Sequence, residues 1–269
     1  MNLTDDWSTD TVRANGIDVH YYRTGTRDGP PVVLAHGFTD NGRCWSPLAA
    51  DLADLGYDVV APDARGHGRS SVPDTGNTAA DRVDDLVGLI DALELSNPVL
   101  IGHSMGGTTA AWTAATHPDL PRGLVLEDPA GMLEDARETA PDDAVCGMRQ
   151  QIRAWQDQSL EETMADIDRE PELAEILATA RTECSESIAE VIREGFSHPR
   201  EAFAEVTCPT LILKADADPD AQADHRETAA ALADGRLVHV DGAGHCVFRD
   251  RYDAAFGELA GFLDDLEFE

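Results

Sequence analysis

Hydrophobic and polar residues follow two different patterns along the chain. Residues 11–24 alternate on both sides of Asn15 and Gly16, which predicts a β-hairpin with a tight turn. Later segments are short apolar runs without alternation, typical of strands that are buried on both faces of a sheet. These runs are residues 32–35, 58–63, 98–102, 123–128, 210–216 and 236–240.

Helical periodicity fills the intervals between several of these runs, at residues 45–55, 79–93 and 104–117. Because strands and helices alternate, we expect an α/β fold with a mostly parallel central sheet and flanking helices. A chain of 269 residues is long enough for one large domain of this kind.

One interval, residues 133–204, breaks the alternation. It is rich in Glu, Asp, Arg, Ala and Met and has helical periodicity without a convincing strand. An interval of about 70 residues is too long for a connecting loop. We therefore expect a helical cap inserted into an α/β core formed by residues 1–132 and 205–269.

The expected cap carries residues that could line a substrate pocket or form the cap's own core. Two arginines in the same interval could bind a substrate carboxylate or make surface ion pairs. The apolar candidates are Met148, Ile152, Trp155 and Met164, and the arginines are Arg149 and Arg153.

The charge balance is strongly acidic, with 52 Asp and Glu residues against 20 Lys and Arg and a net charge of −32. Nucleic-acid binding is disfavoured because phosphate contacts need a basic face. The acidic residues are spread along the chain, and Lys214 is its single lysine. This pattern resembles proteins of extreme halophiles, in which molar salt reduces the Debye length to about 3 Å and screens self-repulsion.

Targeting and metal-binding patterns are absent from the sequence. Residues 1–10 lack a signal-peptide pattern, and no apolar stretch approaches 18 residues. The five cysteines form no C-x-x-C pair. We expect a cytoplasmic protein with a small-molecule substrate, without a cofactor, a metal, a nucleic-acid partner or a membrane partner.

The clearest candidate for chemistry is Ser104, in the sequence Gly102-His103-Ser104-Met105-Gly106. This G-x-S-x-G pattern lies between an apolar run and a helical segment. Small flanking residues permit the sharp strand-to-helix turn that exposes a nucleophilic serine above a sheet.

A serine nucleophile needs a base, and the base needs an orienting acid. His245 follows the last apolar run in a glycine-rich loop and is the candidate base. Asp128, Asp216 and Asp218 all follow apolar runs and lie between Ser104 and His245 in the chain, so each is a candidate acid.

An oxyanion hole needs backbone N–H groups that point to the developing charge. Met105 follows the nucleophile directly, and Phe38 lies in the sequence His36-Gly37-Phe38 after the first buried run. We expect their N–H groups to form the hole. A second glycine-containing turn, residues 63–70, is expected to shape the neighbouring loop.

Four motifs in this order, His36-Gly37, residues 63–70, residues 102–106 and Gly244-His245, resemble the capped α/β-hydrolases. The resemblance implies a Ser, Asp, His triad beneath a helical cap. In the family's usual pattern the acid stands three positions after a small residue, and Ala215 in that position implies Asp218. Asp128 and Asp216 remain alternatives, because Ala215 replaces the usual glycine.

Within the family, Ser104 differs from the aspartate that haloalkane dehalogenases and epoxide hydrolases carry. Residues 36–45, 62–71 and 124–130 are similar to N-formylmaleamate deformylase-type hydrolases. We expect a serine hydrolase acting on a small carboxylic ester. Alternatives with the same triad are an amide, an enol-lactone or a C–C bond hydrolase, and an alternative of another class is a slow ligand-sensing protein.

Overall fold

The computed structural model describes residues 7–132, 141–194 and 199–266. The N-terminal residues 1–6 and the expected cap segments 133–140 and 195–198 lie outside the described residues. The described chain is built on an eight-stranded sheet with the order β1-β2-β4-β3-β5-β6-β7-β8. The strands are β1 (Ser8–Ala14), β2 (Ile17–Gly25), β3 (Pro31–Ala35), β4 (Asp58–Pro62), β5 (Val99–His103), β6 (Gly123–Glu127), β7 (Thr210–Lys214) and β8 (Gly235–His239).

The predicted hairpin is confirmed as β1 and β2, which pair antiparallel along the edge of the sheet. Asn15 and Gly16 connect them with φ values of 44° and 74°. Positive φ at both central residues is the geometry of a type I′ turn, which Asn and Gly favour. β2 pairs antiparallel with β4, and β3 to β8 form a parallel sheet.

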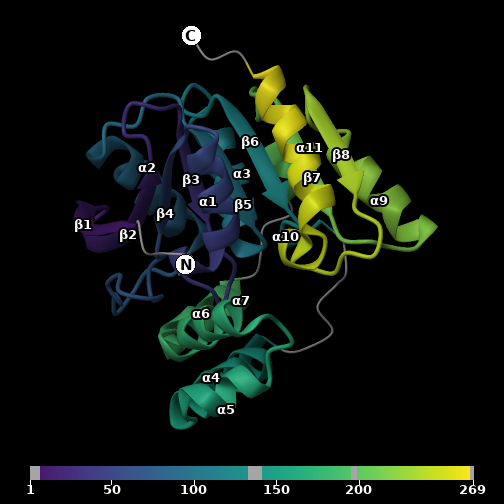
Figure 1. The fold of residues 1–269 in the computed structure, drawn as a ribbon. Coiled ribbons are helices and arrows are strands. Elements are labelled where there is room, and N and C mark those ends of the chain that lie inside the picture. The colour runs from purple at the N-terminus through teal and green to yellow at the C-terminus, as the bar shows by residue number, and fades with distance from the viewer. Residues whose placement is uncertain (1–6, 133–140, 195–198, 267–269) are drawn as a thin grey trace.

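Helices cover both faces of the sheet, as the alternating pattern predicted (Figure 1). One hydrophobic cluster joins the sheet to α1 and α11, and a second joins it to α2, α3 and the helices beside them. The bounds are α1 (Ser46–Asp54), α2 (Ala79–Ala92), α3 (Met105–Thr116), α9 (Pro219–Ala229) and α11 (Tyr252–Asp265), with the short η1 (Gly42–Trp45) and α10 (Val247–Asp250). The expected α/β architecture is therefore confirmed.

Helices also fill the described part of the interval between β6 and β7. In Figure 1, α4 to α7 lie together beyond one end of the strands. The last helix of the interval packs on α3 instead, and Phe203 at its end is fully buried in the core. The bounds are α4 (Pro141–Asp157), α5 (Leu160–Ala165), α6 (Pro171–Thr182), η2 (Glu186–Ala189), α7 (Glu190–Glu194) and α8 (Pro199–Phe203).

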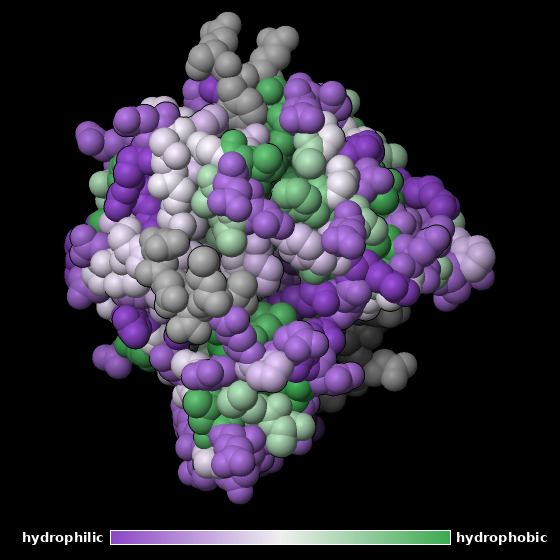
Figure 2. Space-filling view, viewed as in Figure 1, coloured by the Kyte–Doolittle hydropathy of each residue, from purple (hydrophilic) through white to green (hydrophobic). Residues whose placement is uncertain are grey.

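Hydrophilic side chains cover most of the face shown in Figure 2. Among the described residues, the large hydrophobic side chains that are clearly exposed are Leu55, Val72 and Leu160. None of the described helices is long and apolar enough to span a bilayer.

Candidate active site

Ser104 lies at the turn between β5 and α3, with φ 50° and ψ −114°. A positive φ is strained for a residue with a side chain, so surrounding hydrogen bonds must hold it. The Ser104 N–H donates to the carbonyl oxygen of Glu127 at 3.0 Å, and its own carbonyl accepts from the N–H groups of Thr108 and Ala130 at 3.0 and 3.2 Å. These bonds fix the turn to the end of β6 and to the loop that follows it.

Two glycines make this turn sterically possible. A Cβ on Gly102 would lie 2.4 Å from the carbonyl oxygen of Gly106, and a Cβ on Gly106 would lie 2.1 Å from that of Ala35. Backbone atoms cannot move away as a flexible side chain can. The G-x-S-x-G pattern therefore reflects close backbone approach on both sides of Ser104.

His245 lies in the loop after β8, and its imidazole contacts Asp128. The Nδ1 atom of His245 is 2.5 Å from Oδ2 of Asp128. Asp128 comes directly after β6, has φ 40°, and donates its N–H to the carbonyl oxygen of Leu213 at 2.8 Å. The structure therefore pairs a carboxylate after β6 with a histidine after β8, and the backbone of the turn after β5 is bonded to the end of β6 beside that carboxylate.

The preferred sequence candidate for the acid, Asp218, is not the aspartate that contacts His245. Its Oδ1 accepts from the backbone N–H groups of Asp220 and Ala221, both at 3.0 Å, so Asp218 caps the N-terminus of α9. The other alternative, Asp216, accepts from the N–H of Gly242 at 2.9 Å. Of the three candidate acids, the structure thus pairs Asp128 with His245, whereas Asp218 binds backbone donors in α9 and Asp216 binds one in the loop after β8.

Asp128 has a second partner, the cation Lys214 at the end of β7. The Lys214 Nζ is 2.5 Å from Asp128 Oδ1, and the N–H of Ala215 donates to the same oxygen at 3.3 Å. Burial raises the pKa of Asp128, but the hydrogen bond with His245 and the charge of Lys214 outweigh burial and lower the pKa to about 2. Asp128 is therefore a carboxylate throughout the neutral range.

The residues expected to form an oxyanion hole come from two loops next to Ser104. Met105 is the first residue of α3, where backbone N–H groups have no intrahelical acceptor. The carbonyl oxygen of Phe38 lies 2.8 Å from Nε2 of His67, which anchors the other loop. Within the described residues no hydrogen bond from the Phe38 N–H is found.

Buried side chains hold the loop that carries Phe38 against the turn at residues 63–70. The N–H of Ala64 donates to Nε2 of His36 at 2.9 Å, and Nδ1 of His36 lies 2.8 Å from the Gly37 carbonyl oxygen. The carboxylate of Asp63 accepts from the N–H groups of Gly42 and Arg69 at 2.8 and 3.0 Å. These contacts match the shaping function expected for the 63–70 turn.

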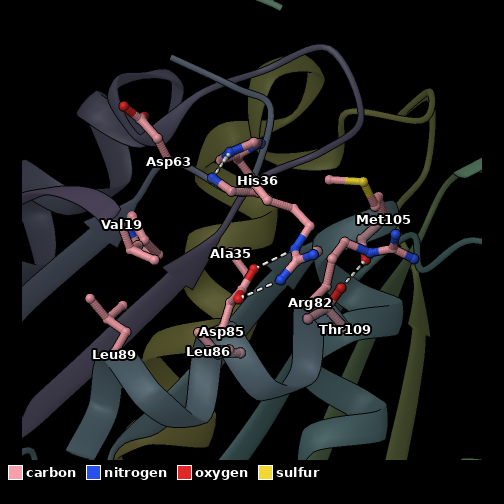
Figure 3. A pocket seen from close by; sticks show the side chains of 14 residues that line it. Val19, Ala35, His36, Asp63, Arg82, Asp85, Leu86, Leu89, Met105 and Thr109 are labelled. Atoms are coloured by element: carbon pink, nitrogen blue, oxygen red, sulfur yellow. Dashed lines mark hydrogen bonds and ion pairs between the residues drawn. The ribbon is translucent and has the colours of Figure 1, made fainter. Parts of the chain in front are cut away.

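A small internal cavity of about 40 Å³ lies beside this loop, lined in part by His36, Arg82 and Met105 (Figure 3). Next to it, Arg65 makes two hydrogen bonds to Asp85 at 2.6 and 2.7 Å. A space of this size is too small for a substrate.

A buried network around His103 had no signal in the sequence beyond the G-x-S-x-G pattern. His103 Nε2 donates to the carbonyl oxygen of His245 at 3.0 Å, and its Nδ1 is 3.7 Å from Asp40. Asp40 in turn accepts from Arg249 at 2.6 Å. Burial lowers the pKa of His103, but the nearby carboxylates of Glu127 and Asp40 outweigh burial and raise it.

The apolar residues proposed for the cap pocket mostly pack with one another. Ile152 is fully buried with Cys184 and Ile188, and Met148, Trp155 and Phe38 pack against this cluster. This cluster thus reaches the loop expected to supply an oxyanion N–H. Arg149 pairs with Glu190 and Arg153 with Glu186, so both arginines take part in ion pairs within the segment between β6 and β7.

A serine with positive φ stands at a strand-to-helix turn, and a paired histidine and carboxylate follow later strands. This arrangement is typical of α/β-hydrolases. Residues 32–259 match the alpha/beta hydrolase family, and the chain belongs to that family. In the part of the chain that the structure describes, no group of three or more His, Cys, Asp or Glu side chains could hold a metal ion.

Similar proteins within the family have several named activities. An epoxide hydrolase from Caballeronia sordidicola is 36% identical over 55% of this chain and 46% of its own length. A 2-(acetamidomethylene)succinate hydrolase from Mesorhizobium japonicum is 35% identical over 48% of this chain and 47% of its length. The chain thus spans about half the length of these curated relatives.

Among solved structures, the N-formylmaleamic acid deformylase from Pseudomonas putida S16 has a similar fold. It has a TM-score of 0.76 and 22% identity, and the match covers 94% of this chain and all of that chain. The similarity is one of fold, and it agrees with the resemblance stated from the sequence.

Proposed function

We propose that this protein is a serine hydrolase that cleaves a small carboxylic ester through Ser104, His245 and Asp128. The observation that carries the proposal is the contact between His245 and Asp128, 2.5 Å between Nδ1 and Oδ2, beside a serine held at positive φ. A carboxylate on Nδ1 directs the other ring nitrogen, Nε2, to accept a proton.

The proposed reaction proceeds in two stages. Ser104 Oγ attacks the carbonyl carbon while His245 Nε2 takes its proton, and the N–H groups of Phe38 and Met105 bind the oxyanion. His245 then gives the proton to the leaving alkoxide, and an acyl-enzyme remains. Water attacks the acyl group in the same way and releases the acid.

The serine at position 104 supports carbonyl chemistry, although one relative is named an epoxide hydrolase. A serine alkoxide forms an acyl ester with a carbonyl substrate and releases it by attack of water at the same carbon. Small amides, enol-lactones and C–C bonds next to a carbonyl can use the same serine. The relative named a 2-(acetamidomethylene)succinate hydrolase makes a small acylated amine the first alternative to an ester.

The first test is covalent labelling of Ser104 with a fluorophosphonate in 2 M KCl, followed by peptide mapping. The second is a set of steady-state assays on p-nitrophenyl acetate and on a panel of amides and lactones. We expect labelling at Ser104 in the wild type, no labelling in Ser104→Ala, and a loss of turnover by about 10³ or more in that variant. Full turnover in a folded Ser104→Ala protein would exclude the mechanism. A single slow turnover per protein molecule would instead support the ligand-sensing alternative.

A further inference from the structure

Lys214 is a buried cation that touches the same carboxylate as His245. The side chain of Lys214 is 8% exposed and that of Asp128 is 10% exposed, whereas the side chain of His245 is 55% exposed. Lys214 Nζ lies 2.5 Å from Oδ1 of Asp128, and His245 Nδ1 lies 2.5 Å from Oδ2. The carboxylate therefore joins a buried ammonium group on one oxygen to an exposed imidazole on the other.

Lys214 is the single lysine in the chain, which otherwise carries arginines as its basic residues. The choice of lysine at this position affects how the carboxylate of Asp128 is bound. An ammonium group is a compact charge that binds one carboxylate oxygen well. A guanidinium is planar and tends to bind both oxygens of a carboxylate at once. At this position an arginine would compete with His245 for Oδ2, whereas a lysine leaves that oxygen free.

The histidines near Lys214 are neutral, so Lys214 carries the positive charge in this region. His239 is its register partner on β8, and His225 on α9 lies 3.0 Å from His239 between Nδ1 and Nε2. Burial and then the charge of Lys214 lower the pKa of His225 to about 4. Burial, Arg226 and Lys214 lower the pKa of His239, against the opposing charges of Asp128 and Asp216. Both histidines are thus neutral near pH 7.

His245 also has a second charged neighbour, His103. The ring of His103 lies 4.8 Å from that of His245 between centroids. His103 is paired with Asp40, so its charge is balanced within its own network. Lys214 is therefore the cation that acts directly on the carboxylate facing His245.

We propose that Lys214 is a positioning residue that fixes one oxygen of Asp128, so that the other oxygen is directed at His245. The inference rests on the proposed function, because it assigns Asp128 as the acid that orients the catalytic histidine. It predicts that Lys214 acts on turnover through Asp128 and leaves substrate binding unchanged.

The test compares Lys214→Met with Arg236→Met in 2 M KCl. Arg236 lies on β8 in an exposed ion pair with Glu258, so this control removes one positive charge outside the site. We expect Lys214→Met to lower kcat by about 10- to 100-fold with KM within twofold, and Arg236→Met to leave both unchanged. The acid limb of the kcat/KM profile should move to higher pH in Lys214→Met alone, because the charge of Asp128 then acts unopposed on His245.

A double-mutant cycle separates positioning from general destabilisation. In an Asp128→Asn background, Lys214→Met should change kcat by less than threefold, because its partner is already lost. An equal loss in both backgrounds would overturn the proposal. So would a Lys214→Met protein with wild-type kcat and pH profile. Lys214→Arg should keep the fold but lower kcat at least fivefold, and full activity of that variant would contradict the one-oxygen arrangement.

One measurement needs no variant at Lys214. In protein labelled with ¹⁵N-lysine, the single Nζ resonance should shift when a fluorophosphonate modifies Ser104. Modification without a shift in the wild type would overturn the coupling. Failure of the serine mechanism is recognised separately, since Ser104→Ala would then retain turnover, whereas a wrong inference about Lys214 leaves the Ser104→Ala result intact.

Discussion

The side chain of His103 donates a hydrogen bond to the backbone carbonyl of His245, 3.0 Å from Nε2 to the oxygen. His103 is the residue before the proposed nucleophile, so the bond ties the end of β5 to the loop after β8. Its other ring nitrogen faces Asp40 at 3.7 Å, in the loop that carries Phe38. One buried imidazole thus connects three of the four segments that carry the proposed site, those after β3, β5 and β8.

Replacing His103 should therefore disturb catalysis without removing a reacting group. We expect His103→Leu to lower kcat by about 100-fold, because a displacement of His245 by about 1 Å has that effect. His103→Gln keeps an amide N–H and should retain more activity. Steady-state kinetics on p-nitrophenyl acetate, with thermal unfolding to verify the fold, measure both. Equal activity of the two variants would show that the hydrogen bond to His245 is unimportant.

The two aspartates compared above should respond to substitution in opposite ways. Asp128→Asn should lower kcat by about 10⁴-fold, because the wrong histidine tautomer is then favoured. Asp218→Ala should keep kcat and lower the free energy of unfolding by about 1 kcal/mol, because it removes the N-cap of α9. Kinetics and urea unfolding on both variants test the assignment of Asp128. Loss of kcat in Asp218→Ala with normal Asp128→Asn activity would reverse it.

Glycines at the turn and on the surface provide a test of steric crowding. A Cβ on Gly106 would meet the carbonyl of Ala35 at 2.1 Å, whereas a Cβ on Gly257 of α11 has no atom within 4 Å. Gly106→Ala should cost about 3 kcal/mol or more, as severe overpacking does. Gly257→Ala should add about 0.5 to 1 kcal/mol through helix propensity. Chemical unfolding of both variants measures the difference, and a stable Gly106→Ala protein would contradict the close packing.

Stability should fall as the pH decreases from about 6.5 to 4. Burial, followed by the effect of His36, lowers the pKa of His67 to about 4. In this pH range the unfolded chain binds a proton that the folded chain does not, so stability is lost as pH falls. For His67 the effect amounts to about 3 kcal/mol. Urea unfolding from pH 7 to 4 should show a weaker pH dependence in His67→Gln, and an unchanged dependence would exclude His67 as a source.

Salt should stabilise the protein strongly. With a net charge of −32, self-repulsion opposes folding in dilute buffer, and molar salt screens it within about 3 Å. We expect the unfolding temperature to rise continuously between 0.1 and 2 M KCl. The same experiment with sucrose in place of salt controls for solvent exclusion. No difference between 0.1 and 2 M KCl would argue against adaptation to salt.

The sheet and the nucleophile turn could be predicted because their signals are local. Short apolar runs such as residues 123–128 are typical of strands buried on both faces, and Asn15-Gly16 strongly favours a hairpin turn. Gly102 and Gly106 flank Ser104 at a spacing that the backbone contacts require. In each case a few neighbouring residues determine the local structure.

The acid was harder to predict because three aspartates follow strands that end at one edge of the sheet. The choice depends on contacts across more than 80 residues, from Asp128 to Lys214 and His245. One local signal was available, since Asp218 precedes Pro219 at the first position of α9, which is the pattern of a helix N-cap. The His103 network had no such signal, because Asp40, Glu127 and Arg249 meet only in the folded chain.

The burial of Lys214 also allows local opening of the protein to be measured with amine-reactive reagents. Amine-reactive reagents find one side-chain target in this sequence, and that target is enclosed beside Asp128. Acylation of Nζ therefore requires the end of β7 to separate from its neighbours, so its rate measures how often this region opens. Mass spectrometry of the intact chain would measure the extent of acylation over time.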